Sequence, residues 1–295
     1  MILITTYYDS DNLYRNNEII QCLINNNNNK HIKRIYLLND KIYPLDFLQD
    51  DSKIIQIIVD NDNKKRLGFD YAFSFINSTL IGQKCILANS DIFFDNSLSH
   101  LEHFNLNNYF LSLSRYEDIN KTQLSQAWSQ DTWIFNSPCR IDKNLCKFKF
   151  GTLGCDSKLN YLAYKENYNI VNPSKTIFSF HLHASNIRTY NKEYRIDKPH
   201  IWVNSSFLHE KGQLTLKTDS ELILLPLKVG DSRISRPILL NTNTNTNTNT
   251  NTNLKKNAKQ SKQSKQYTSP TPTSNLLIKF QRDKSRCKQM LLKSN

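Results

Sequence analysis

Residues 86–95 place polar side chains inside a strongly apolar run. Asn89, Ser90 and Asp91 stand between Ile-Leu-Ala on one side and Ile-Phe-Phe on the other. A carboxylate that enters a buried region is costly unless it pairs with a charge or binds a cation. Mg²⁺ or Mn²⁺ meets that need with one or two carboxylates, waters and phosphate oxygens. Such a site suits the departure of a nucleoside diphosphate from a sugar, because the ion neutralises the charge of the leaving phosphate.

Two histidines further along the chain are candidate partners for this motif. His181 and His183 are two residues apart on an expected strand, so both side chains point to one face. That placement is compatible with metal ligation by either residue, with His181 slightly favoured. The alternative is that each is an ordinary core histidine.

An alternation of strands and helices is expected to position these residues. β-Branched and aromatic runs predict the strands, and apolar residues at helical spacing predict the helices. The expected strands are 2–8, 35–38, 54–59, 85–88, 109–113, 132–135 and 177–183, and the expected helices are 13–24, 67–76 and 156–167. The asparagine run 25–29 is expected to break the first helix. This order predicts an α/β sheet with helices on its faces and ligands at the carboxyl ends of its strands.

The positive charge of the chain belongs to its end. The 295 residues carry 39 Lys and Arg against 26 Asp and Glu, a net charge of +13, but residues 254–295 hold 11 of the basic residues and only one acid. Nucleic-acid binding is therefore not expected of the nearly neutral body, and the tail could make a weak contact with polyanions. The six cysteines form no CxxC pair, which argues against a zinc knuckle. No run approaches the length of a membrane span.

The pattern of the chain changes after residue 210. Short apolar runs in 211–240 predict a small β appendage. Asn-Thr alternation followed by Lys, Gln, Ser and Pro predicts a disordered linker over 241–275. Residues 276–295 predict a basic tail that could form a short amphipathic helix. The main domain is therefore expected to span 1–210.

The ordered motifs together resemble a known family. The chain is similar to GT-A fold glycosyltransferases, in particular to small stand-alone glycosyltransferase-like proteins of bacteria and large DNA viruses. It departs from them in having Asn89 where an Asp often stands. The resemblance covers roughly residues 1–203 and rests on 2–8, 66–77, 85–95, 129–135, 154–156, 172–174, and His181 and His183 with Ser185, Arg188 and Tyr190.

The resemblance implies a Rossmann-like mixed sheet and a role for each motif. Asp91 would ligate Mn²⁺ or Mg²⁺ with His181 or His183. Asp156 would be the general base that takes the proton of an acceptor hydroxyl, or else an ordinary helix cap. Asp131 is the second candidate base or an acceptor-binding residue. The residues expected to line the nucleotide-sugar pocket are Thr5, Tyr7, Tyr8, Arg66, Asn89 and Ser90.

The function implied is transfer of a sugar from a UDP- or GDP-sugar to a hydroxyl of a glycan or protein. A cytoplasmic location, in the host cytoplasm or a virion if the protein is viral, is expected. The main alternative is a degenerate transferase-fold scaffold with a polyanion-binding tail, motivated by Asp91 being the one strong carboxylate of the motif. A nuclease or phosphatase with two metals ranks last, because no convincing set of converging carboxylates is visible.

Overall fold

The computed structural model describes residues 1–59, 66–117, 119–122, 124–185 and 194–211, and the strands at 215–217, 222–225 and 238–240. The chain divides into two units, Met1–Asn245 and Thr246–Asn295. Every described residue belongs to the first unit. Both expected tail segments, 241–275 and 276–295, therefore lie outside the described residues, and the three expected boundaries between the four segments stay predictions.

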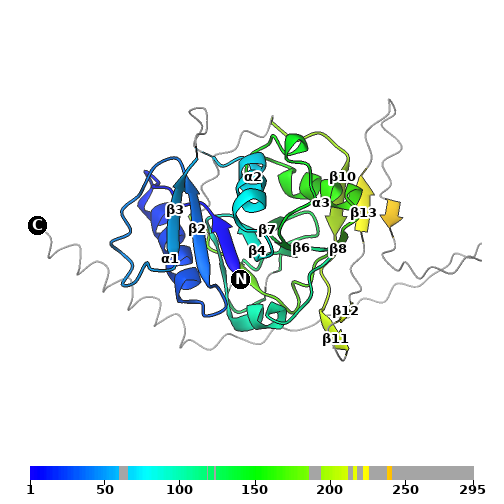
Figure 1. Ribbon diagram of the computed structural model, residues 1–295, viewed down its shortest axis with the longest axis horizontal. Coiled ribbons are helices and arrows are strands. Elements are labelled where there is room, and N and C mark those ends of the chain that lie inside the picture. The colour runs from blue at the N-terminus through cyan, green and yellow to red at the C-terminus, as the bar shows by residue number, and fades with distance from the viewer. Residues whose placement is uncertain are drawn as a thin grey trace, which may run out of the picture. The chain divides into compact units, whose positions relative to one another are not determined.

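A seven-stranded mixed sheet, in the order β3-β2-β1-β4-β7-β6-β8, forms the centre of the first unit (Figure 1). β1 to β4 run parallel, β7 is antiparallel to both of its neighbours, and β8 is parallel to β6. Six strands therefore present their carboxyl ends at one edge, where β7 presents its amino end. The strands are β1 (Ile2–Thr5), β2 (Arg34–Asn39), β3 (Ile54–Ile58), β4 (Lys84–Ala88), β6 (Tyr109–Ser114), β7 (Gln130–Asn136) and β8 (Asn169–Val171).

Helices cover both faces of this sheet. The apolar residues of α2 (Phe69–Thr79) and α3 (Cys155–Lys165) pack with Ile2 and Ile4 of β1 in one core. Those of α1 (Leu13–Asn28) pack with Leu3 in the other core. Successive strand residues face opposite sides, so each sheet face has its own apolar set. The expected mixed α/β sheet with helices on both faces is confirmed.

The asparagine run 25–29 does not break the first helix where we expected. α1 continues to Asn28, four residues beyond the predicted end. The helix continues because an asparagine of the run bonds to residues that are distant in the sequence. Asn26 is buried, donates to the carbonyl of Ile92 at 2.8 Å and accepts from the amide of Phe94 at 3.2 Å. These bonds satisfy side chains that would otherwise compete with the helix backbone.

A small antiparallel pair of strands, whose pairing was not predicted from the sequence, forms a sheet separate from the main one. β5 (Ile92–Phe94) pairs with β9 (Ser179–His181), and Ile92 lies opposite His181. β9 is shorter than the predicted strand 177–183. Two further short sheets are β10-β13-β14 and β11-β12. The remaining elements are η1 (Asn96–Leu101), η2 (Lys143–Leu145), β10 (His200–Val203), β11 (His209–Lys211), β12 (Thr215–Lys217), β13 (Leu222–Leu225) and β14 (Ile238–Leu240).

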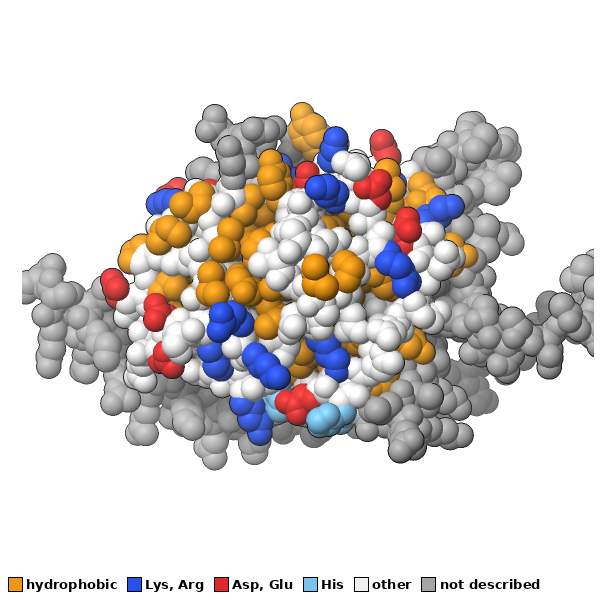
Figure 2. Space-filling model, viewed as in Figure 1, with side chains coloured by type: hydrophobic (Ala, Val, Ile, Leu, Met, Phe, Trp, Pro, Cys, Tyr) orange, Lys and Arg blue, Asp and Glu red, His pale blue; other side chains and the backbone are white. Residues whose placement is uncertain are grey.

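The surface of the described part of the chain mixes charges of both signs. Basic and acidic side chains both occur across the face in Figure 2, in keeping with the nearly neutral body. Among the described residues, none of the helices combines the length and the apolar character that crossing a membrane requires.

Candidate functional site

Asp91 lies at the carboxyl edge of the sheet, in the turn between β4 and β5. The residue is only 7% exposed. Its Oδ2 accepts a hydrogen bond from Nη2 of Arg15 at 2.6 Å and lies 3.1 Å from Nε2 of His181. Nδ1 of His183 is 3.9 Å from the same oxygen. The guanidinium and both imidazoles therefore approach the same oxygen of the buried carboxylate.

The pairing of β5 with β9 brings the histidines to Asp91. His181 is the last residue of β9, and the next amide, that of Leu182, donates to the carbonyl of Asp91 at 3.0 Å. The rings of His181 and His183 then stack, with centroids 5.1 Å apart and planes at 13°. The sequence prediction of two side chains on one face agrees with this arrangement.

Ion pairing sets the protonation of this cluster. Burial would raise the pKa of Asp91, but His181 and then Arg15 hold it well below its usual range. Burial would lower the pKa of His181, but hydrogen bonds to Asp91 and Glu117 raise it to about 9. Burial and then the charge of Arg15 lower the pKa of His183. His181 is therefore the charged imidazole of the pair near neutral pH.

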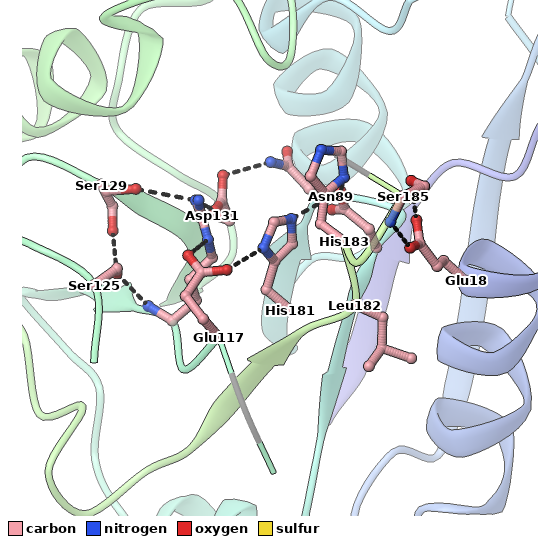
Figure 3. Close-up of polar contacts among 12 residues, drawn as sticks. Glu18, Asn89, Glu117, Ser125, Ser129, Asp131, His181, Leu182, His183 and Ser185 are labelled. Atoms are coloured by element: carbon pink, nitrogen blue, oxygen red, sulfur yellow. Dashed lines mark hydrogen bonds and ion pairs between the residues drawn. The ribbon is translucent and has the colours of Figure 1, made fainter. Parts of the chain in front are cut away.

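A chain of polar contacts leads from His181 to Asp131 (Figure 3). Nδ1 of His181 lies 2.7 Å from Oε2 of Glu117, and Oε1 of the same carboxylate accepts from Nε of Arg115 at 2.8 Å. Arg115 also donates to Asp131, at the start of β7. The second oxygen of Asp131 accepts from Nδ2 of Asn89 at 2.5 Å. The two sequence motifs, 89–91 and 129–135, are thus joined through side chains.

Asp156 stands at the start of α3, next to this chain of contacts. Its oxygens accept from the amides of Ser157 at 2.8 Å and Gln130 at 3.3 Å. The cap residue of α3 is Gly154, so Asp156 lies inside the first turn. Burial, reinforced by the negative charge of Asp131, raises the pKa of Asp156 to about 7. This carboxyl therefore changes charge near neutral pH.

The other expected site residues lie in different surroundings. Thr5, at the end of β1, is buried, and the ring of Tyr7 packs among Tyr43 and Phe47. Tyr8 and Ser90 are half-buried. Arg66 donates to the carbonyls of Phe150 and Gly151 at 3.3 and 3.2 Å, in the loop before α3. Arg188 and Tyr190 lie outside the described residues.

The residues around Asp91 fit a divalent ion by their chemistry. Asp91, His181 and His183 each offer one ligand atom, and these atoms lie within 4.8 Å of one another. One carboxylate with two imidazoles suits Mn²⁺ better than Mg²⁺, which prefers oxygen ligands. We therefore assign these three residues as the candidate metal ligands.

Four charged residues of the site were missed by the sequence analysis: Arg15, Glu18, Arg115 and Glu117. Arg15 and Glu18 lie one turn apart on α1, and both are nearly buried. Glu18 accepts from the amide and hydroxyl of Ser185 at 2.7 and 2.8 Å. Arg115 and Glu117 follow β6, so a search for polar residues after each strand would have found them. No local signal marks Arg15.

Comparison with known proteins finds similarity in structure but not in sequence. No protein-family model matches the chain, and no curated protein matches it. Among solved structures, the chain is similar to the apo form of the glycosyltransferase GlyE of Streptococcus pneumoniae TIGR4, with 15% identity and a TM-score of 0.40. The alignment covers 66% of this chain and 57% of that one. The chain thus spans less than two thirds of that protein, and a similarity of this size assigns neither activity nor substrate.

Proposed function

We propose that the chain is a metal-dependent glycosyltransferase that moves a sugar from a UDP- or GDP-sugar to a hydroxyl of a glycan or protein acceptor. One observation carries this proposal. Asp91, His181 and His183 converge at the carboxyl edge of the sheet, and Asn89 and Asp131 connect them to the neighbourhood of Asp156. Ligand sites in open α/β sheets lie at this edge.

The metal ligands would hold Mn²⁺ or Mg²⁺ against the donor diphosphate. When bound, the ion supplies positive charge that neutralises the departing nucleoside diphosphate. Two buried atoms at the same edge, Oγ1 of Thr5 and Oδ1 of Asn89, have no hydrogen-bond partner among the described residues. Buried polar atoms are normally satisfied, so these two are suited to hydrogen bonds with the donor.

Asp156 would accept the proton of the attacking hydroxyl. A carboxyl with a pKa near 7 is poised to take a proton at neutral pH, which an ordinary aspartate is not. Asp131 already accepts from Arg115 and Asn89, so we assign it to positioning and to raising the pKa of Asp156. The choice of Asp156 over Asp131 as base follows from this difference in partners.

Donor turnover tests the proposed function. We expect the purified chain with Mn²⁺ to release nucleoside diphosphate from at least one member of a panel of UDP- and GDP-sugars. Asp91→Asn should lower that rate by about a hundredfold or more. Asp46→Asn changes an exposed carboxylate and should leave the rate unchanged. Release from no donor, or equal rates for Asp91→Asn and wild type, would overturn the proposal.

A second candidate is a transferase-fold scaffold that has lost catalysis. The observation that favours it is Arg15, which already neutralises Asp91 from 2.6 Å. The two candidates differ in nucleotide binding by residues 1–245. The transferase predicts binding of UDP or GDP that Mn²⁺ strengthens in equilibrium dialysis, whereas the scaffold predicts no binding in either condition.

A further inference from the structure

The guanidinium of Arg15 lies against two of the three candidate metal ligands. Its Nη2 is 2.6 Å from Oδ2 of Asp91, and its Nη1 is 2.7 Å from Nδ1 of His183. The side chains of Arg15 and Asp91 are each only 10% exposed. This is a buried ion pair, which stabilises only while both charges keep their partners.

The contact between Arg15 and His183 shows which nitrogen of the imidazole accepts the hydrogen bond. A guanidinium has only donors, so Nδ1 of His183 must accept through its lone pair. A metal ion binds a neutral imidazole through the same kind of lone pair. An ion held by Nδ1 of His183 and Oδ2 of Asp91 would therefore compete with Arg15 for both atoms.

The geometry points to Arg15 as a resident cation that competes with the divalent ion, so that metal binding requires the guanidinium to leave Asp91 and His183. This inference rests on the proposed metal site. It adds a determinant of metal affinity that lies outside the ligands themselves, on α1. The wild-type site should accordingly bind metal more weakly than the same three ligands without Arg15.

The displaced guanidinium keeps polar partners close by. Nη1 of Arg15 already lies 3.2 Å from Oε2 of Glu18 and 3.4 Å from the carbonyl of Leu182. Glu18 is fixed in turn by the amide and hydroxyl of Ser185. The positive charge can therefore shift toward Glu18 without being left unpaired, which lowers the cost of its displacement.

Metal affinity of an Arg15 variant tests the inference without any enzyme assay. Arg15→Met keeps an unbranched side chain and removes the charge. We expect the metal-stripped full-length variant to bind Mn²⁺ at least about tenfold more tightly than wild type, measured from the electron paramagnetic resonance signal of free Mn²⁺. Arg34→Met, at the opposite edge of the sheet, removes the same charge from an exposed position and should leave the Kd unchanged.

Arg15→Met removes a partner of the buried Asp91, and the variant could fail to fold for that reason. A second measurement therefore tests the inference on the wild-type protein. Titration with the diamagnetic ion Zn²⁺ should shift the Arg15 Nε–H resonance together with the ring signals of His181 and His183. An Arg15 resonance that stays unchanged while the ring signals shift overturns the inference. So does a folded Arg15→Met protein that binds Mn²⁺ no more tightly than wild type.

Failure of this inference is distinguishable from failure of the proposed function. Equal Mn²⁺ affinity in the two proteins, with donor turnover by wild type, rejects the competition and keeps the transferase. Tighter binding by Arg15→Met, with no turnover of any donor, supports the competition and rejects the transferase.

Discussion

The ionisable residues around Asp91 form one continuous series of contacts. It runs from Arg15 to Asp91, His181, Glu117 and Arg115, and ends at Asp131. Opposite charges alternate along the series. Burial would raise the pKa of Glu117, but His181 and Arg115 lower it to about 2. Effects of substitutions within such a network are not additive, so we expect double variants to deviate from the sum of the single ones.

The pKa of Asp156 predicts the pH dependence of the reaction. The base must be ionised to accept a proton, and its pKa is about 7, so the rate should rise as pH increases through about 7. Asp156→Asn should lower the rate by roughly 10²- to 10⁴-fold and abolish this rise. Initial rates at saturating donor from about pH 5.5 to 8.5 measure both effects.

Asp142→Asn serves as the control, because Asp142 is an exposed carboxylate before η2. It should keep the wild-type rate and the rise near pH 7. An Asp156→Asn protein with the full rate would remove Asp156 from the chemistry.

The raised pKa of His181 predicts a loss of stability at high pH. Its pKa is about 9 in the folded chain against about 6.5 for a free histidine, so its contribution is complete below about pH 6.5 and is lost as pH rises through 9. The contribution is on the order of 3 kcal/mol. Urea unfolding in EDTA at about pH 6 and 9.5 should show this loss in wild type and a smaller one in His181→Gln. Equal losses in the two proteins would show that His181 is not the group responsible.

At the scale of elements, the asparagine run tests how α1 is held against β5. Asn26→Ala removes the two bonds to the backbone of β5 and leaves buried polar groups unsatisfied, which should cost about 1–3 kcal/mol of unfolding free energy. Asn28→Ala, two residues on at an exposed position, should be neutral or slightly stabilising because alanine favours helix. Urea denaturation of the two variants makes the comparison. Equal effects would mean that the bonds of Asn26 do not hold this end of the helix.

The main elements could be predicted from the sequence because local pattern and burial agree in them. β4 and α3 have the expected type and nearly the expected bounds, since their apolar residues face the two cores. β1 has the expected type and start but ends at Thr5, three residues before the predicted end of 2–8. β5 could not be predicted, because Ile92–Phe94 is too short to show a period and its partner β9 is distant in sequence. The end of α1 depends in the same way on β5.

Some residues of the candidate site could likewise be predicted from the sequence, and others could not. Asp91, His181 and His183 were predicted as ligands from type and spacing, and the structure places them together. Arg15 was missed because its role depends on the packing of α1 over β5 across 76 residues of sequence. The roles of Thr5, Tyr7, Tyr8, Arg66, Asn89, Ser90, Asp131 and Asp156 stay predictions.

At the scale of the whole molecule, the two units differ in net charge. Residues 246–295 hold 11 basic residues and one acid, and the first unit is nearly neutral. Deleting residues 246–295 should therefore abolish retention on a heparin column at low salt and leave the rate of donor turnover within about twofold. Retention of the shortened chain would place the polyanion contact in the first unit. A lost rate in a folded shortened chain would make the tail part of the enzyme.

The most direct test of the central claim is an anomalous difference map from a crystal soaked with Mn²⁺ and a nucleoside diphosphate. The account predicts a manganese peak within bonding distance of Asp91 and His181, with His183 as a third ligand and the diphosphate beside the ion. It also predicts that the Arg15 guanidinium has left Asp91. A well-occupied peak away from Asp91, or bound nucleotide with no manganese at Asp91, would contradict the account.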